Sequence, residues 1–296
     1  MARYIESYTT KKQVEFDVAL HNLEKPYVAY ASGAMDYNSI PVKEYATLIT
    51  KYFTIIPEED FEFSWPKLGD AVVEYSLDDG STWAEMTSAT TVALTTSDKL
   101  LLRGNNDSYE NKGFSITDKR YSVEGNIMSI IDTSNFSTQP QFKGPGAFRG
   151  FFSGNSVTSA ESLILPAKEV YAQTYNLMFQ KCTSLTSAPI ILTQKLNGTT
   201  VFTEMFSGCT ALTSACIDGV AIINQNTAFR AMFNGCTSLR YIRCLSVTAS
   251  GTGIFNNWVK SVAASGTFVK DPGATFWTTG VAGIPSGWTV VDYTYE

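Results

Sequence analysis

A 27-residue repeat in the C-terminal half of the chain constrains the fold more than any other feature of the sequence. Segments that begin at Tyr175, Phe202 and Phe229 align without gaps. The positions that recur at this spacing are Phe179, Phe206 and Phe233, Cys182, Cys209 and Cys236, and Leu185, Leu212 and Leu239. A degenerate copy that contains Phe152 precedes them, with Asn155 at the cysteine position. A period of this length predicts a solenoid in which stacked units bury one continuous core.

Each repeat combines a short helical pattern with a strand pattern. Phe229, Met232 and Phe233 are spaced as on one face of a helix, and Gly235 follows as a helix stop. Residues 239–245 then carry a strand pattern. We therefore expect a mainly β fold with short helices, in which the repeats form a leucine-rich-repeat-like solenoid and the recurring phenylalanines stack in one buried ladder.

The repeat motif Met-Phe-x-Gly-Cys-Thr-Ser-Leu-Thr resembles the repeat of the BspA-like leucine-rich-repeat proteins of gut and oral Bacteroidetes. Residues 258–270 and 283–290 resemble the terminal segment of that family. The resemblance covers residues 125–296 and implies a solenoid with a role in surface adhesion and in binding proteins or matrix. Exported members of the family carry secretion or anchoring signals, which the sequence from Met1 onward lacks. We therefore expect a protein that is made in a cytoplasm without a signal peptide.

The N-terminal half is expected to contain a small β-sandwich-like domain at residues 46–124. Its candidate strands are separated by turn residues and cover residues 52–56, 72–76, 91–94 and 99–103. This part of the chain would precede the repeat solenoid as a separate β unit.

One turn in this region carries a specific motif. Residues 76–83 read Ser-Leu-Asp-Asp-Gly-Ser-Thr-Trp, which resembles the Asp-box hairpin of sialidases and other β-propellers. In such a hairpin Asp78 would accept hydrogen bonds from backbone amides, Gly80 would supply a positive φ and Trp83 would pack beneath the turn. A sialidase needs several such boxes, an arginine triad and a Tyr/Glu nucleophile pair. We therefore interpret the single copy as a structural turn.

The two ends of the chain are expected to differ in role. Residues 1–45 lack an amphipathic pattern long enough for a core of their own, so we expect an attachment segment that orders against a partner. The alternative is that this segment adds edge strands to the β-sandwich-like domain. The solenoid is expected at residues 125–245 and a C-terminal cap at residues 246–296. In the cap, Trp277 and Trp288 either close the last repeat or contact a ligand such as a sugar.

The chain resembles virion or prophage proteins of Bacteroidetes-infecting phages, including crAss-like phages. The segments that carry this resemblance are Lys25-Pro-Tyr-Val-Ala-Tyr, the hairpin motif, Leu101-Leu-Arg-Gly-Asn-Asn and Gly125-Asn-Ile-Met-Ser, followed by the BspA-like repeats. The resemblance implies a virion-located head or tail fibre or decoration protein. It would dock on capsid or tail proteins through residues 1–45 and project the solenoid toward a host-surface protein or glycan. Symmetric particles present repeated sites, so we expect a homo-oligomer, either a dimer or a trimer.

Two other classes remain open as alternatives. The first is a bacterial cell-surface or secreted adhesin of the BspA type, and the second is a carbohydrate-active enzyme. The acidic stretches at residues 58–62 and 78–79 would have to supply the carboxylates of such an enzyme. Adjacent acids on a turn do not show the separation across a cleft that glycosidases need, so we interpret them as solvated turns.

Little in the sequence points to catalysis or to a cofactor. The only histidine, His21, has no nucleophile motif around it, which argues against Ser-His-Asp, Cys-His and His-based zinc sites. The five cysteines form no C-x-x-C pair and are expected to be reduced, buried and unliganded. We therefore expect a non-enzymatic protein with no cofactor and no metal.

The charge distribution argues against two further kinds of partner. The net charge is −6 and no run of Lys or Arg is longer than two, so we expect no nucleic-acid partner. No stretch reaches about 18 apolar residues, so we expect no membrane insertion.

Overall fold

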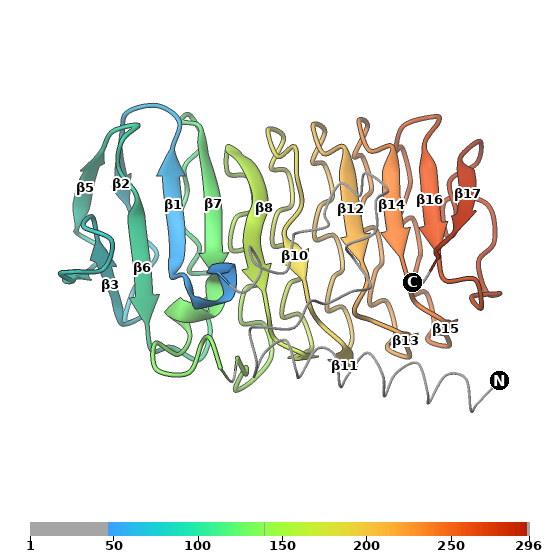
Figure 1. Cartoon of the computed structure of the whole chain (residues 1–296), viewed down its shortest axis with the longest axis horizontal. Coiled ribbons are helices and arrows are strands. Elements are labelled where there is room, and N and C mark those ends of the chain that lie inside the picture. The colour runs from blue at the N-terminus through green and yellow to red at the C-terminus, as the bar shows by residue number, and fades with distance from the viewer. Residues whose placement is uncertain (1–46, 139, 295–296) are drawn as a thin grey trace.

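The computed structural model describes residues 47–138 and 140–294 as an elongated, mainly β molecule. Its strands stand side by side along the long axis, from the N-terminal strands at one end to β17 (Thr289–Asp292) at the other (Figure 1). The C-terminal part is a β-solenoid of about five turns. The expected mainly β architecture, a β-sandwich-like part followed by a repeat solenoid, is confirmed.

Antiparallel pairing builds the N-terminal part. Its main sheet has the strand order β4-β3-β6-β1-β7, and a second sheet contains β2 and β5. The bounds are β1 (Phe53–Pro57), β2 (Phe61–Ser64), β3 (Val73–Ser76), β4 (Ala84–Met86), β5 (Thr91–Leu94), β6 (Leu100–Gly104) and β7 (Tyr121–Asn126). Phe53 and Ile55 of β1 and Phe63 of β2 are fully buried, so the two sheets share one apolar interior.

The last of these strands, β7, joins the two parts of the molecule. It pairs antiparallel with β1 on one side and parallel with β8 (Val157–Leu165) on the other, and a short 3₁₀ helix, η2 (Ile127–Ile130), follows it. The expected boundary between residues 124 and 125 therefore lies inside a strand that both parts share.

Parallel strands continue the sheet through the solenoid. They are β10 (Ile190–Ile191), β12 (Ser214–Ile217), β14 (Tyr241–Cys244), β16 (Thr267–Lys270) and β17. Single bridges from Ser187 to Ser159 and to Ser214 connect the sheet between β8 and β12. A second row of short parallel pairs forms another side of the coils: β9 (Glu169–Tyr171) with β11 (Lys195–Asn197), and β13 (Ile222–Ile223) with β15 (Thr248–Ala249).

The third side of each coil is a series of tight turns, and the expectation of a short helix in each repeat is wrong. In one coil the backbone enters the left-handed region at every fourth residue, at Gln173, Leu177 and Lys181, with φ of 61°, 60° and 61°. A right-handed helix does not include such residues. The same spacing recurs in the next coil at Thr200, Glu204 and Gly208.

Hydrogen bonds between coils explain these turns. The amides of Tyr175 and Leu177 donate to carbonyls of the next coil, those of Val201 and Thr203, at 3.1 and 3.0 Å. The intervening amides bond within their own coil, as Met178 does to the Tyr175 carbonyl at 3.3 Å. A helix would use all of these amides internally, whereas this alternation gives every second amide to the neighbouring coil.

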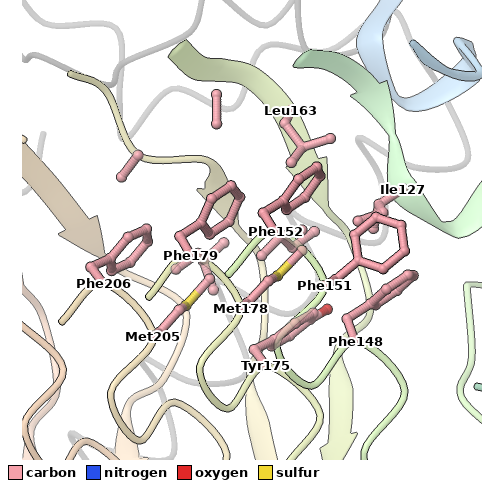
Figure 2. Packing of buried hydrophobic residues seen from close by; sticks show 14 of the residues in the cluster. Ile127, Phe148, Phe151, Phe152, Leu163, Tyr175, Met178, Phe179, Met205 and Phe206 are labelled. Carbon is pink, nitrogen blue, oxygen red and sulfur yellow. The ribbon is translucent and has the colours of Figure 1, made fainter. Parts of the chain in front are cut away.

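Aromatic rings from successive coils stack into two ladders inside the solenoid. One ladder contains Phe152, Phe179, Phe206 and Phe233, with ring centroids 4.8, 5.6 and 5.7 Å apart, and its first three rings are drawn in Figure 2. The second ladder contains Tyr175, Phe202, Phe229 and Phe255. A single apolar cluster runs from Phe53 to Trp288, so the N-terminal sheets and the coils share one core.

Candidate functional site

The recurring residues of the repeat all point into the core. The phenylalanines, the cysteines and Leu185, Leu212 and Leu239 are fully buried. Each recurring cysteine also donates a hydrogen bond from its thiol to the carbonyl of a phenylalanine in the preceding coil. The Sγ atoms of Cys182, Cys209 and Cys236 lie 2.9, 3.0 and 3.0 Å from the carbonyl oxygens of Phe152, Phe179 and Phe206. These residues therefore hold neighbouring coils together.

Burial makes these thiols unreactive. It raises the pKa of Cys182 and Cys236 to about 12 and the pKa of Cys209 well above its usual range, because a thiolate loses its hydration in the core. A protonated, buried thiol is neither a good nucleophile nor a metal ligand. No disulfide joins the five buried cysteines of the described chain.

The predicted hairpin residues form the turn between β3 and β4. Asp78 accepts hydrogen bonds from the Thr82 amide at 2.9 Å, the Thr82 hydroxyl at 2.7 Å and the Ser76 hydroxyl at 2.7 Å. These bonds, those from Thr82 first, lower the pKa of Asp78 to about 2. Gly80 has a φ of 86°, and the Trp83 indole donates to its carbonyl at 2.9 Å. The Asp78 carboxylate accepts hydrogen bonds only from residues of its own turn among those that the structure describes, which fits a structural role.

The two predicted aromatic contacts lie in residues 246–296, the expected cap, where β16 and β17 continue the parallel sheet of the solenoid. Trp288 is buried, and its indole donates to the Ala263 carbonyl at 2.8 Å. Trp277 packs against Trp258 and Phe268 with ring centroids 5.4 and 4.9 Å apart. Both rings close the last coil.

His21 and the acidic residues at 58–62 are the other residues that the sequence offered for a reactive centre. His21 and residues 1–45 lie outside the described residues. Glu58 and Glu59 form ion pairs with Arg120 and Lys119 at 3.2 and 3.6 Å. Across residues 47–138 and 140–294, no group of three or more His, Cys, Asp or Glu is placed to hold a metal ion. Within the same ranges, no helix has the length and apolar character needed to cross a membrane.

One place on the surface departs from the repeat, namely the corner where the turn side of a coil meets the sheet. The parallel register aligns Ser214 with Tyr241 and Tyr241 with Thr267. By this register the corner reads Leu-Thr-Ser at 212–214, Leu-Arg-Tyr at 239–241 and Ser-Gly-Thr at 265–267. One coil has the large polar residues Arg240 and Tyr241 at this corner, and the next coil has the small residues Ser265 and Gly266.

A threonine ladder shows what the corner does in the earlier coils. The hydroxyls of Thr158, Thr186 and Thr213 donate to carbonyls of the preceding coil, those of Tyr121, Thr158 and Thr186, at 3.0, 2.8 and 3.3 Å. At the next step the residue is Arg240, which has no hydroxyl, and the amides of Arg240 and Tyr241 donate to the Thr213 carbonyl at 3.0 and 3.3 Å, as the Thr213 amide does to the Thr186 carbonyl at 3.2 Å. The Arg240 side chain is therefore not needed to join the coils.

These departures meet in an open pocket of about 470 Å³. Its polar lining consists of Thr213, Ser214, Arg240, Tyr241, Ser265 and Thr267, and the small residues Ala263 and Gly266 complete it. The lining holds one cationic group and contains no carboxylate. We refer to this hollow as the corner pocket.

A row of hydroxyl-bearing residues runs through the corner pocket along the solenoid. The strand register and the single bridges align Ser159, Ser187, Ser214, Tyr241, Thr267 and Thr289 on successive rungs. Their neighbours Ala215, Ile242 and Phe268 are buried in the core, so the row lies on the opposite face of the strands, where Ser214 is buried and Tyr241 and Thr267 are half-buried. Neighbouring rungs are about 4.8 Å apart.

None of the corner residues was singled out from the sequence. The signal was present in the repeat alignment, because Arg240 and Tyr241 replace a threonine and a serine that recur in the two preceding copies. Reading it required the register of the last coil, in which Thr267 follows Tyr241 after 26 residues rather than 27.

Comparison with family models, with curated proteins and with solved structures returned no match for this chain.

Proposed function

We propose that the chain is a non-enzymatic structural and binding protein, a rigid arm that carries a ligand-binding surface on its solenoid. The observation that carries this proposal is the single apolar core from Phe53 to Trp288, beside a sheet that single bridges at Ser187 continue from the N-terminal strands to β17. Backbone hydrogen bonds tie the coils together on the sheet, on the second strand row and on the turn side. Such stacking suits a spacer that holds a surface at a fixed distance from its anchor.

The division of the polar residues supports a binding role. The recurring thiols, the threonine ladder and Asp78 are all occupied by hydrogen bonds that hold the fold together. The corner pocket differs, because it departs from the repeat and presents Arg240 at the surface. Solenoids bind ligands on their exposed surfaces, and binding residues are common on surface segments that a rigid scaffold positions.

The proposed setting is a phage particle, with the arm as a head or tail fibre or decoration protein. Its support is the sequence resemblance to BspA-like repeats and to phage virion proteins. Residues 1–45 would dock on capsid or tail proteins as a dimer or trimer. The solenoid surface would then face a host-surface protein or glycan.

Purified particles test this setting. Antibodies raised against the full chain should detect it in phage particles banded on a density gradient, in a fixed number of copies per particle. Detection in the envelope fraction of bacteria, with none in the particles, would contradict the virion setting and favour the adhesin.

A glycan array separates binding from catalysis. We expect the full chain to be retained on a subset of glycans without shortening them. Release of smaller sugars from the array, measured by mass spectrometry, would contradict the non-enzymatic assignment and favour a carbohydrate-active enzyme.

A further inference from the structure

We propose that the corner pocket binds a carboxylate-bearing sugar, such as a uronic acid unit of a polysaccharide. This inference rests on the proposed binding function and names the ligand class of the same surface. Three features of the pocket point to this ligand: a single unopposed guanidinium, a set of uncommitted hydroxyls and a hollow formed by small residues.

The guanidinium of Arg240 selects for an anion. The side chain is exposed and forms no hydrogen bond or ion pair with any other residue in the described ranges. The nearby Arg243, in contrast, holds Asp218 through two hydrogen bonds of 2.7 and 2.5 Å. A guanidinium binds a planar carboxylate through two parallel hydrogen bonds. With no carboxylate in the pocket lining to compete, Arg240 is available for one supplied by a ligand.

The serine and threonine hydroxyls of the corner pocket favour a sugar over other anionic ligands. Among the residues that the structure describes, none is a hydrogen-bond partner for the hydroxyls of Ser214, Ser265 and Thr267. The hydroxyls of the threonine ladder, in contrast, donate to backbone carbonyls. A hydroxyl both donates and accepts, which matches the hydroxyls of a sugar ring. The carboxylate at a peptide C-terminus would satisfy Arg240 but leave these groups to water.

Small residues leave the hollow open at this corner. Ala263, Ser265 and Gly266 line it on the side of the last coil, whereas Leu239 is buried in the core and does not line it. Gly266 is required in this wall because a Cβ there would clash with the Arg240 carbonyl oxygen. The resulting volume, about 470 Å³, falls within the range of small-ligand sites.

The hydroxyl row extends the site beyond one sugar unit. Ser187 and Thr289 continue the row on either side of the pocket residues, one rung at a time. The half-buried ring of Tyr241 adds an aromatic surface against which the C–H face of a sugar can pack. A polysaccharide that lies along the solenoid axis would meet the hydroxyls of Ser187, Ser214, Thr267 and Thr289 in turn, with its acidic unit at Arg240.

Binding of two matched sugars to the full chain tests the inference. Methyl glucuronide and methyl glucoside differ in one carboxylate, and titration followed by saturation-transfer NMR reports on each. We expect the acid to bind about tenfold more tightly, an interaction worth about 1.4 kcal/mol. Arg240→Thr, which restores the residue of the threonine ladder, should bring the acid down to the level of the neutral sugar.

Three further variants check that the loss is local. Ser265→Leu places a larger apolar side chain in the pocket and should abolish binding of both sugars. Arg240→Lys keeps the charge without the two-pronged geometry and should lose part of the preference for the acid. Arg230→Thr removes the same charge from the turn side, where Arg230 lies 4.0 Å from Glu204, and should bind like the parent chain. A thermal melt like that of the parent shows that each variant is folded.

Other results would overturn the inference. Equal affinity for the two sugars, or an affinity unchanged in folded Arg240→Thr, would exclude the corner pocket as an acidic-sugar site. Tighter binding of a short peptide with a free C-terminus would assign the pocket to protein ligands. Either result leaves the proposed binding arm intact, because a different ligand or surface would then serve it. Cleavage of an acidic oligosaccharide would instead contradict the non-enzymatic function.

Discussion

Single thiols hold the turn sides of neighbouring coils together, and their burial makes the chain sensitive to alkali. The pKa of Cys182 and Cys236 in the folded chain is about 12, above the ordinary value of 9.0. A raised pKa of this kind leaves stability intact below pH 9 and removes it as the pH rises toward 12. We expect the melting temperature to fall across this window. In a variant with serine at positions 182, 209 and 236, which keeps the donor and does not titrate, it should fall less.

The same burial protects the thiols from reagents. Native protein should react slowly with a thiol reagent at pH 8, and the denatured chain should titrate five thiols without added reductant. Fewer than five thiols after denaturation would mean that a disulfide or a ligand occupies some of them.

Ladders of identical residues are the elements that give the solenoid its stability. Phe206 is fully buried between Phe179 and Phe233, with centroids 5.6 and 5.7 Å away. Phe206→Ala should lower the free energy of unfolding by about 3–5 kcal/mol, because it removes the ring that stacks on Phe179 and Phe233 and leaves a cavity. Urea unfolding followed by circular dichroism measures this loss.

Phe206→Leu is the matched control for the ladder. Leucine keeps most of the buried volume and should cost less than alanine at the same position. A urea midpoint that does not move in Phe206→Ala would show that the ladder does not stabilise the solenoid.

The whole molecule should unfold as one unit, because one sheet and one core cross from the N-terminal part into the coils. Phe53 of β1 contacts Phe151 and Phe152 of the first coil, with ring centroids 6.2 and 6.0 Å apart. Phe53→Ala should therefore lower the melting temperature of the entire chain. Amide hydrogen exchange around Trp65, in the N-terminal part, and around Trp258, in the last coil, should change together.

Two separate transitions would contradict this coupling. Stacked coils contact only their neighbours and are able to unfold in segments. If Phe53→Ala loosened the region around Trp65 and left Trp258 protected, β7 would be a weak joint rather than a shared strand.

The sequence by itself determined the repeat, the buried ladders and the hairpin around Asp78. A side chain that returns at a fixed spacing, such as Phe179, Phe206 and Phe233, meets the same surroundings in every coil, so its burial is readable without a structure. The hairpin is equally local, because its hydrogen bonds join Asp78 to residues two and four positions away.

Only the tertiary structure decided the conformation of the turn side, the continuity through β7 and the corner pocket. The apolar spacing of Phe229, Met232 and Phe233 fits a helix, and the turns prevail because every second amide finds a carbonyl in the next coil. Such bonds join residues a full repeat apart, which local spacing does not encode. The corner pocket depends on the same distant register, since a coil one residue shorter than the repeat sets Gly266 beside Arg240. The positions of residues that follow the repeat were predictable from the sequence. The positions of residues that depart from it are set only by how the coils stack.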